Sequence, residues 1–232
     1  MILRAPPLLL SLPLLGLSWL LPASGVGLWL RLAAASLVLL LPGRLLARAL
    51  GRRGPATAFV WSIALVAGAL ALTFAVHGSL ELTLALVLAA GVVALPFSWR
   101  RGVRGPAHPE VLRGGWMAAL AGIGLGAAVW GIEGIVQGDA IFHLGRMRKL
   151  VDFGSLSLRA IDEFKDGGLH PGYAFPLWHG WLACVAKLAR VDPTLVVLHE
   201  SSILAPLALV LAFEMGRVVF RSGWRRCSCR CR

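Results

Sequence analysis

Long apolar runs with no polar face are the feature that most constrains the fold of this chain. Five of them stand out: Val26 to Leu41, Ala56 to Val76, Leu80 to Phe97, Trp116 to Ile132 and Leu204 to Phe220. Runs of this kind approach the roughly 20 residues that an α-helix needs to cross a bilayer. Only helices and closed barrels satisfy every backbone hydrogen bond in lipid. The sequence therefore predicts an all-α, polytopic transmembrane helix bundle in the cell membrane, with the lipid bilayer as its first partner.

The composition excludes the usual soluble classes. The 232 residues are 58% hydrophobic and only 15% charged, whereas soluble domains carry about 25% charged residues. A net charge of +12 would suit a nucleic-acid partner in a soluble protein. Here the basic residues lie between apolar runs and no stacking aromatics are interleaved with them, so no nucleic-acid partner is expected.

The segment Leu8 to Leu21 is shorter than the later runs and follows Arg4. It is interpreted as a first membrane helix that turns at Pro22 to Gly25, and a signal-peptide core with a cleavage site there is the alternative. With this helix, residues 1–132 are predicted to form an N-terminal transmembrane bundle of about five spans. Gly122, Gly124 and Gly126 in the last of these spans favour close helix packing.

The loops alternate in charge, which predicts their orientation. Arginines cluster after the segments Val26 to Leu41 and Leu80 to Phe97, whereas the turns at 22–25 and 77–81 carry no Lys or Arg. The first cluster is Arg44, Arg48, Arg52 and Arg53, and the second is Arg100, Arg101, Arg104 and Arg113. Cytoplasmic loops carry the excess of Lys and Arg. The arginine loops are therefore predicted to lie inside, and the fifth span should bring Glu133 to the outer face.

Residues 133–175 break the apolar pattern and hold six of the 11 acidic residues. Apolar side chains from Ile141 to Val151 keep a helical spacing, so this segment is predicted to be an external acidic loop with an outward-facing amphipathic juxtamembrane helix. Asp139, His143 and Arg146 fall at positions i, i+4 and i+7 and share one helical face.

Two interpretations of this face stay open. It belongs to a solvated interfacial helix whose charges pair with each other and with lipid headgroups, or it forms a catalytic or ligand site. In the second case Asp139 is a general base or a cation ligand, His143 is a ligand or a proton carrier, and Arg146 and Arg148 hold phosphate.

The stretch from His170 to His179 contains two prolines, two histidines and three aromatic residues, which is unlike a membrane helix. The piece from Pro176 to Ala189 is too short to cross a roughly 30 Å core at 1.5 Å per residue. Residues 176–221 are therefore predicted to form a short re-entrant or juxtamembrane helix and the last transmembrane helix. That helix ends at Arg217 and Arg221, again inside; if the short piece did span, the charge rule would be violated.

The order of these features from Glu133 to Phe220 resembles the first external loop of GT-C glycosyltransferases. The similarity lies in the run Gly138-Asp139-Ala140-Ile141-Phe142-His143 and in Tyr173-x-x-Pro176-Leu177-x-His179. Protein mannosyltransferases and lipid A aminoarabinose transferases belong to that family. Many members carry two adjacent acids where this chain has Asp139 and then Ala140; Asp162, Glu163 or Asp166 would have to supply the second. The first four spans have no counterpart in simple members.

The resemblance implies sugar transfer from a polyprenyl-phosphate donor, a lipid-linked partner, at the outer membrane face. It implies Asp139 as the catalytic base or cation ligand. It further implies a substrate- or phosphate-binding group made of Arg146, Arg148, His170, Tyr173 and His179. A divalent cation, where the reaction uses one, would be held by Asp139 and His143.

Residues 222–232 form a basic, Cys-rich tail unlike the rest of the chain, ending in Cys227-Ser228-Cys229-Arg230-Cys231-Arg232. Zinc sites use wider spacings and more ligands, so an aberrant tail on a truncated or frame-shifted N-terminal fragment is expected. The alternative function is a non-enzymatic transport or assembly subunit whose acidic loop binds a partner or lipid. Polar residues inside the spans would favour transport. Few exist here: Arg31 lies near one helix end and Glu214 near another.

Overall fold

The fold consists of helices throughout the part of the chain that the structure describes. A computed structural model describes residues 10–52, 54–100, 109–132, 134–162 and 175–228, without the side chains of 109–112 and 221–228. The helices are α1 (Ser11–Ser18), α2 (Gly25–Ala49), α3 (Pro55–Ala75), α4 (Leu80–Arg100), α5 (Pro109–Trp130), α6 (Asp139–Asp152), α7 (Leu177–Ala189) and α8 (Pro193–Ser228). The predicted all-α bundle is confirmed.

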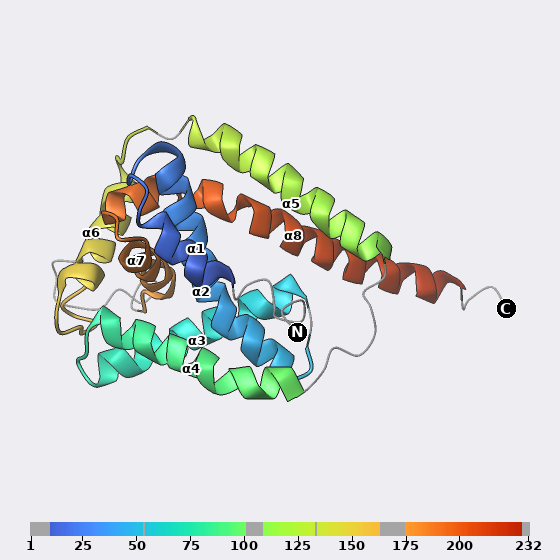
Figure 1. The fold of residues 1–232 in the computed structure, drawn as a ribbon, viewed down its shortest axis with the longest axis horizontal. Coiled ribbons are helices and arrows are strands. Elements are labelled where there is room, and N and C mark those ends of the chain that lie inside the picture. The colour runs from blue at the N-terminus through green and yellow to red at the C-terminus, as the bar shows by residue number, and fades with distance from the viewer. Residues whose placement is uncertain (1–9, 53, 101–108, 133, 163–174, 229–232) are drawn as a thin grey trace.

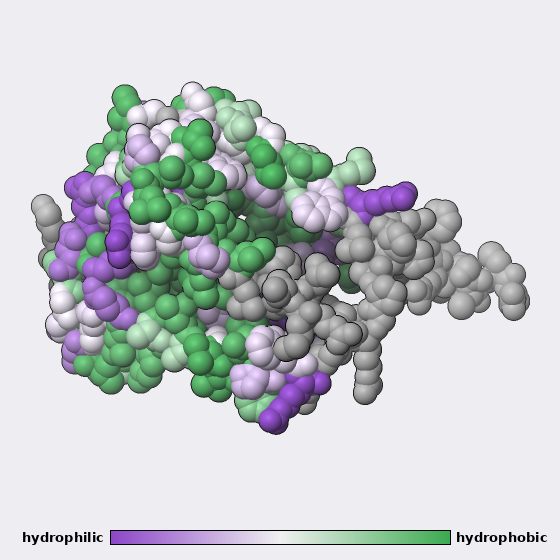
Figure 2. Space-filling model, viewed as in Figure 1, coloured by the Kyte–Doolittle hydropathy of each residue, from purple (hydrophilic) through white to green (hydrophobic). Residues whose placement is uncertain are grey.

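Four described helices are long and apolar enough to cross a membrane. They are α2, α3, α4 and the Pro193–Phe220 part of α8, with lengths of 25, 21, 21 and 28 residues. At 1.5 Å per residue each exceeds the roughly 30 Å of a hydrocarbon core. In Figure 2 hydrophobic residues cover much of the middle of the visible face, and hydrophilic residues gather at its left end. The chain is a membrane protein with several membrane-crossing helices.

The first and fifth predicted spans differ from these four. The structure describes residues 10–21 of the Leu8 to Leu21 segment, and the helix α1 there has 8 residues, about 12 Å against the roughly 30 Å of a hydrocarbon core. It packs against α2. α5 has 22 residues but is not among the four apolar spans. It lies antiparallel along α8 in Figure 1.

The two ends of the bundle are chemically different. One end, called here the arginine end, is where α2 and α4 stop, α3 and α5 begin and α8 finishes (Figure 1). Two contacts tie it together: the Arg44 guanidinium lies 3.4 Å from the Gly54 carbonyl oxygen, and the Ala56 N–H donates to Glu214 Oε2 at 2.8 Å. The second contact places an α8 carboxylate at the N-terminus of α3, where the helix dipole favours negative charge.

The opposite end carries α6 and α7. α7 has 13 residues, about 20 Å, so it cannot cross the bilayer. Nine of those residues are buried, because α7 packs against α2, α3, α6 and α8. The N–H of Leu156, just after α6, donates to the carbonyl of Gly78 in the α3–α4 turn at 2.8 Å. α6 and α7 thus form a layer over this end of the bundle.

Arg31 fixes the end of α7 to the first two helices. Its guanidinium contacts the carbonyl oxygens of Ala189 and Arg190 at 3.5 and 3.4 Å, and those of Trp19 and Leu21 at 3.1 and 2.6 Å. A guanidinium carries five donors, and helix C-termini leave carbonyls unsatisfied. One side chain on α2 therefore serves the ends of both α1 and α7.

Candidate functional site

The candidate site is built on α6. Gly138, with φ of 59°, lets the chain turn into the helix, and Asp139 occupies its first turn. Lys149 lies in the last turn, so the charges at both ends complement the helix dipole. Arg146, Met147 and Leu150 are buried on one side, while Asp139 and Arg148 are exposed.

Two histidines meet where α6 packs on α7. His143 Nδ1 lies 2.8 Å from His179 Nε2, a hydrogen bond whose donor depends on the tautomers. His179 is 6% exposed and His143 is partly buried. Phe142 lies edge-on to both, with ring centroids 5.4 Å from His143 and 6.3 Å from His179. The structure thus brings together two residues that are 36 positions apart.

Arg146 lies beside this pair and is 1% exposed. Its guanidinium carbon is 5.7 Å from the centroid of the Phe142 ring, within the range of a cation–π contact. The pKa of His179 falls from its ordinary 6.5 to about 4, because burial disfavours the charged ring and because Arg146 and His143 add positive charge nearby. His179 is therefore neutral at pH 7, and its hydrogen bond fixes the orientation of the His143 ring.

Asp139 lies on the solvent side of the same pair. It precedes His143 by one helical turn, which places the two Cβ atoms about 6 Å apart, and it is exposed. The site is therefore graded, with a carboxylate at the surface, His143 behind it, and His179 and Arg146 in the interior. An exposed carboxylate beside an oriented imidazole can accept a proton and pass it on.

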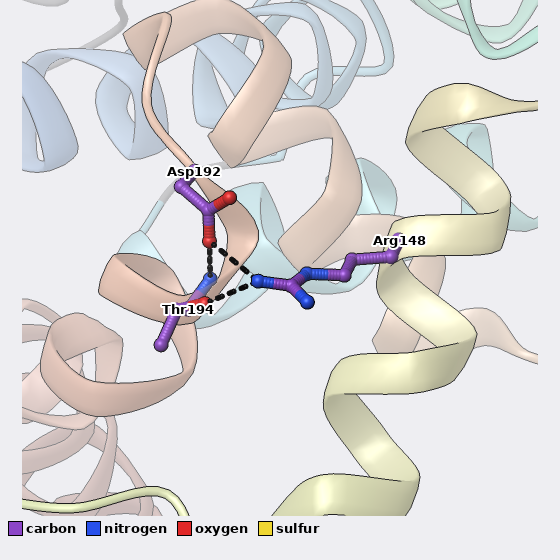
Figure 3. Close-up of polar contacts among 3 residues, drawn as sticks. All are labelled: Arg148, Asp192 and Thr194. Atoms are coloured by element: carbon purple, nitrogen blue, oxygen red, sulfur yellow. Dashed lines mark hydrogen bonds and ion pairs between the residues drawn. The ribbon is translucent and has the colours of Figure 1, made fainter.

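Arg148 points elsewhere. Its guanidinium contacts Asp192 Oδ1 at 3.4 Å and Thr194 Oγ1 at 3.1 Å at the start of α8 (Figure 3). Two positions along a helix correspond to about 200° of rotation, so Arg148 and Arg146 face different sides. Asp192 also accepts the Thr194 N–H at 2.8 Å. The pKa of the Asp192 carboxyl is lowered, first by a hydrogen bond with the Thr194 side chain and then by the Thr194 N–H and by Arg148. Arg148 ties α6 to α8 and does not share the site with His143.

Other predicted site residues lie outside the described part. His170 and Tyr173, expected to bind substrate, and the candidate second acids Glu163 and Asp166 fall in the segment 163–174. Asp162 is described, and its backbone carbonyl accepts a hydrogen bond from Lys149 Nζ at 2.8 Å.

The predicted cation can be tested for fit against the donors present. Among the described residues no group of three or more His, Cys, Asp or Glu side chains gathers as a metal site. Asp139 and the Nε2 of His143 offer two donors on one helical face, and His143 Nδ1 is engaged with His179. Magnesium is commonly held by one or two carboxylates together with water and substrate phosphates, so these residues fit a cation that arrives with a phosphorylated substrate.

One buried acidic residue of the bundle was not predicted from the sequence. Glu200 of α8 is buried and lies 2.6 Å from Ser36 Oγ on α2. The last span was expected to begin at Leu204, but α8 begins at Pro193, so that expectation was wrong. The signal was present: Asp192, Pro193 and Thr194 form an N-cap followed by proline in the first turn.

In comparisons with known proteins, no protein-family model, curated protein or solved structure matches the chain.

Proposed function

We propose that this chain belongs to a glycosyltransferase of the cell membrane that transfers a sugar from a polyprenyl-phosphate donor at the outer face. The observation that carries the proposal is the graded site on α6. Asp139 is exposed beside a hydrogen-bonded histidine pair, and Arg146 supplies a buried positive charge next to it. The site lies at the end of the bundle opposite the arginine end. The charge rule assigns the arginine end to the inside and therefore the site to the outside.

The residues support a single-displacement step. Asp139 takes the proton of an acceptor hydroxyl, and the acceptor oxygen bonds to the anomeric carbon of the sugar. The bond from that carbon to the phosphate oxygen breaks, and the polyprenyl phosphate leaves with the bonding electrons. His143, oriented by neutral His179, carries the proton onward, and the charge of Arg146 favours the anionic leaving group.

A second function is favoured by a different observation. A transport or assembly subunit was expected to carry polar residues inside its spans, and Glu200 lies within the Pro193–Phe220 span. This buried carboxyl is far along the chain from α6 and has no role in the transfer step. It supports the alternative more strongly than Arg31 or Glu214, both of which contact helix ends.

The test is sugar transfer by the full-length gene product in native membranes, with a radiolabelled polyprenyl-phosphate sugar. Asp139→Asn keeps the size and hydrogen bonding of the side chain and removes its charge. We expect a loss of about 10²- to 10⁴-fold in rate at matched expression, typical of a missing general base. Asp152→Asn, which changes an exposed carboxylate at the other end of α6, is the matched control.

Equal rates in the wild type and Asp139→Asn would remove Asp139 from the mechanism and leave it as a solvated interfacial charge. Absence of transfer in the wild type with every polyprenyl-phosphate sugar tried would favour the transport or assembly function.

A further inference from the structure

Glu200 occupies an unusual position for a carboxyl group. It is 2% exposed and lies inside a helix that is long and apolar enough to cross the membrane. Oε1 lies 2.6 Å from Ser36 Oγ, and Oε2 has no hydrogen-bond partner among the described residues. A carboxylate left in such surroundings costs several kcal/mol. The group is therefore stable there only if its charge is neutralised.

The hydrogen bonds around Ser36 show how. Ser36 Oγ also lies 2.9 Å from the carbonyl oxygen of Leu32, a bond in which only the serine can donate. A hydroxyl has a single proton to donate. When that proton serves Leu32, the bond between Ser36 and Glu200 must be donated by Glu200, which is then a carboxylic acid. The 2.6 Å separation lies in the ordinary range for an O–H···O bond.

Four charged or titratable residues on the neighbouring helices have contacts elsewhere. Arg44 of α2, which lines the cavity described below, contacts the Gly54 carbonyl at the arginine end. Arg31 of α2 contacts carbonyls of α1 and α7, and Lys187 of α7 pairs with Glu81 of α4. His199 of α8 stacks on Trp130 of α5 at 3.9 Å. In the described part of the chain no ion pair reaches Glu200.

We propose that Glu200 and Ser36 form a proton-binding site inside the membrane, in which Glu200 is held as the neutral acid. Ser36 also lines an apolar cavity of about 460 Å³ between α2, α3, α5 and α8, together with Ile203 and Leu207 of α8. Ile203 and Leu207 follow Glu200 by about one and two turns and share its helical side. The cavity thus reaches the serine of the proposed proton site. The proposal depends only on α2 and α8 and stands whichever function α6 has.

The direct test is infrared spectroscopy of the full chain in lipid at pH 7. The difference spectrum of wild type minus Glu200→Gln should contain the C=O stretching band of a carboxylic acid, shifted in deuterated water. Glu214→Gln is the matched control, because Glu214 lies in the same helix and accepts the Ala56 N–H. The difference spectrum of wild type minus Glu214→Gln should contain carboxylate bands. Loss of carboxylate bands in the Glu200→Gln difference would overturn the proposal.

A second test uses wild-type protein alone, so it can be carried out even if Glu200→Gln fails to fold. Dicyclohexylcarbodiimide is apolar and reacts with protonated carboxyls. An ordinary glutamate is protonated in roughly one molecule in 500 at pH 7, so the adduct at Glu200 should exceed that at exposed carboxylates on the order of a hundredfold. Peptide mapping by mass spectrometry locates the adduct. No adduct at Glu200 would count against the proposal.

Discussion

At the scale of single residues, His179 links the site to the stability of the fold. Its folded-state pKa of about 4 lies below the ordinary 6.5 because of burial first and the charges of Arg146 and His143 second. Below about pH 6.5 the unfolded chain takes up a proton that the folded chain accepts only near pH 4. The free energy of unfolding should therefore fall as the pH drops from about 6.5 to about 4, and this group should add no pH dependence above 6.5.

His179→Gln should remove this contribution, because glutamine reaches the Nε2 position without titrating. At pH 4 the wild type should have lost on the order of 3 kcal/mol through His179 alone. Thermal unfolding in lipid nanodiscs at pH 4.5 and 7.5 measures the difference. His77→Asn is the control, since His77 is exposed and asparagine tolerates its φ of 52°. An equal acid-induced drop in wild type and His179→Gln would refute the assignment.

Some of the site could be predicted from local spacing and some could not. Asp139 and His143 share a face because helical periodicity alone decides it. Contact between His143 and His179 depends on how α7 folds back, which no local pattern encodes. The burial of Arg146 was also hidden, because a charged residue on an amphipathic helix is ordinarily solvated. Arg148 was grouped with Arg146 by residue type, and helix geometry separates them.

At the scale of helices, α5 and α8 approach closely through glycine. A Cβ added at Gly122 would collide with the backbone of Pro206, and one at Gly126 with the carbonyl oxygen of Ser202. At Gly124 the added atom would meet nothing within 4 Å. The three glycines look equivalent in the sequence, and only the packing distinguishes them.

Gly122→Ala and Gly126→Ala should each lower the stability of the α5–α8 pair by about 1–3 kcal/mol, because backbone must move to admit the methyl group. Gly124→Ala should be neutral or slightly stabilising, since alanine is the better helix former. Detergent-solubilised protein would be compared by thermal unfolding, with Gly124→Ala as the internal control. Equal melting temperatures for all three variants would mean that the helices do not pack in this way.

The helix boundaries show what hydropathy can and cannot detect. α3 and α4 begin within one residue of the predicted positions, because Pro55 and the His77-Gly78-Ser79 turn interrupt apolar runs sharply. α8 extends eleven residues further towards the N-terminus than its apolar run does, since His199 and Glu200 interrupt the hydropathy and the helix continues through them. A helix can therefore continue through polar residues where the apolar run has ended, as α8 does.

At the scale of the whole molecule, hydrophilic residues gather at the end of the visible face where α6 lies, beside an apolar middle (Figures 1 and 2). α2 and α4 stop at the arginine end, and α6 and α7 cover the other end (Figure 1). The structure places the arginine end and the α6 end at opposite ends of the bundle. Which of them faces the cytoplasm is predicted from charge alone. An excess of arginine predicts that its end faces the cytoplasm and that α6 faces outward.

Single cysteines test this orientation in intact cells. The four native cysteines are first replaced by alanine; among them Cys184 is buried, which raises the pKa of its thiol to about 12. Ser155→Cys then places an exposed thiol beside α6, and Leu50→Cys one in the arginine loop without removing a charge. A membrane-impermeant maleimide should label Ser155→Cys only. Both variants should react after permeabilisation, which controls for access. Labelling of Leu50→Cys in intact cells would show that the protein has the opposite orientation. The α6 site would then face the cytoplasm, where the proposed transfer at the outer face could not occur.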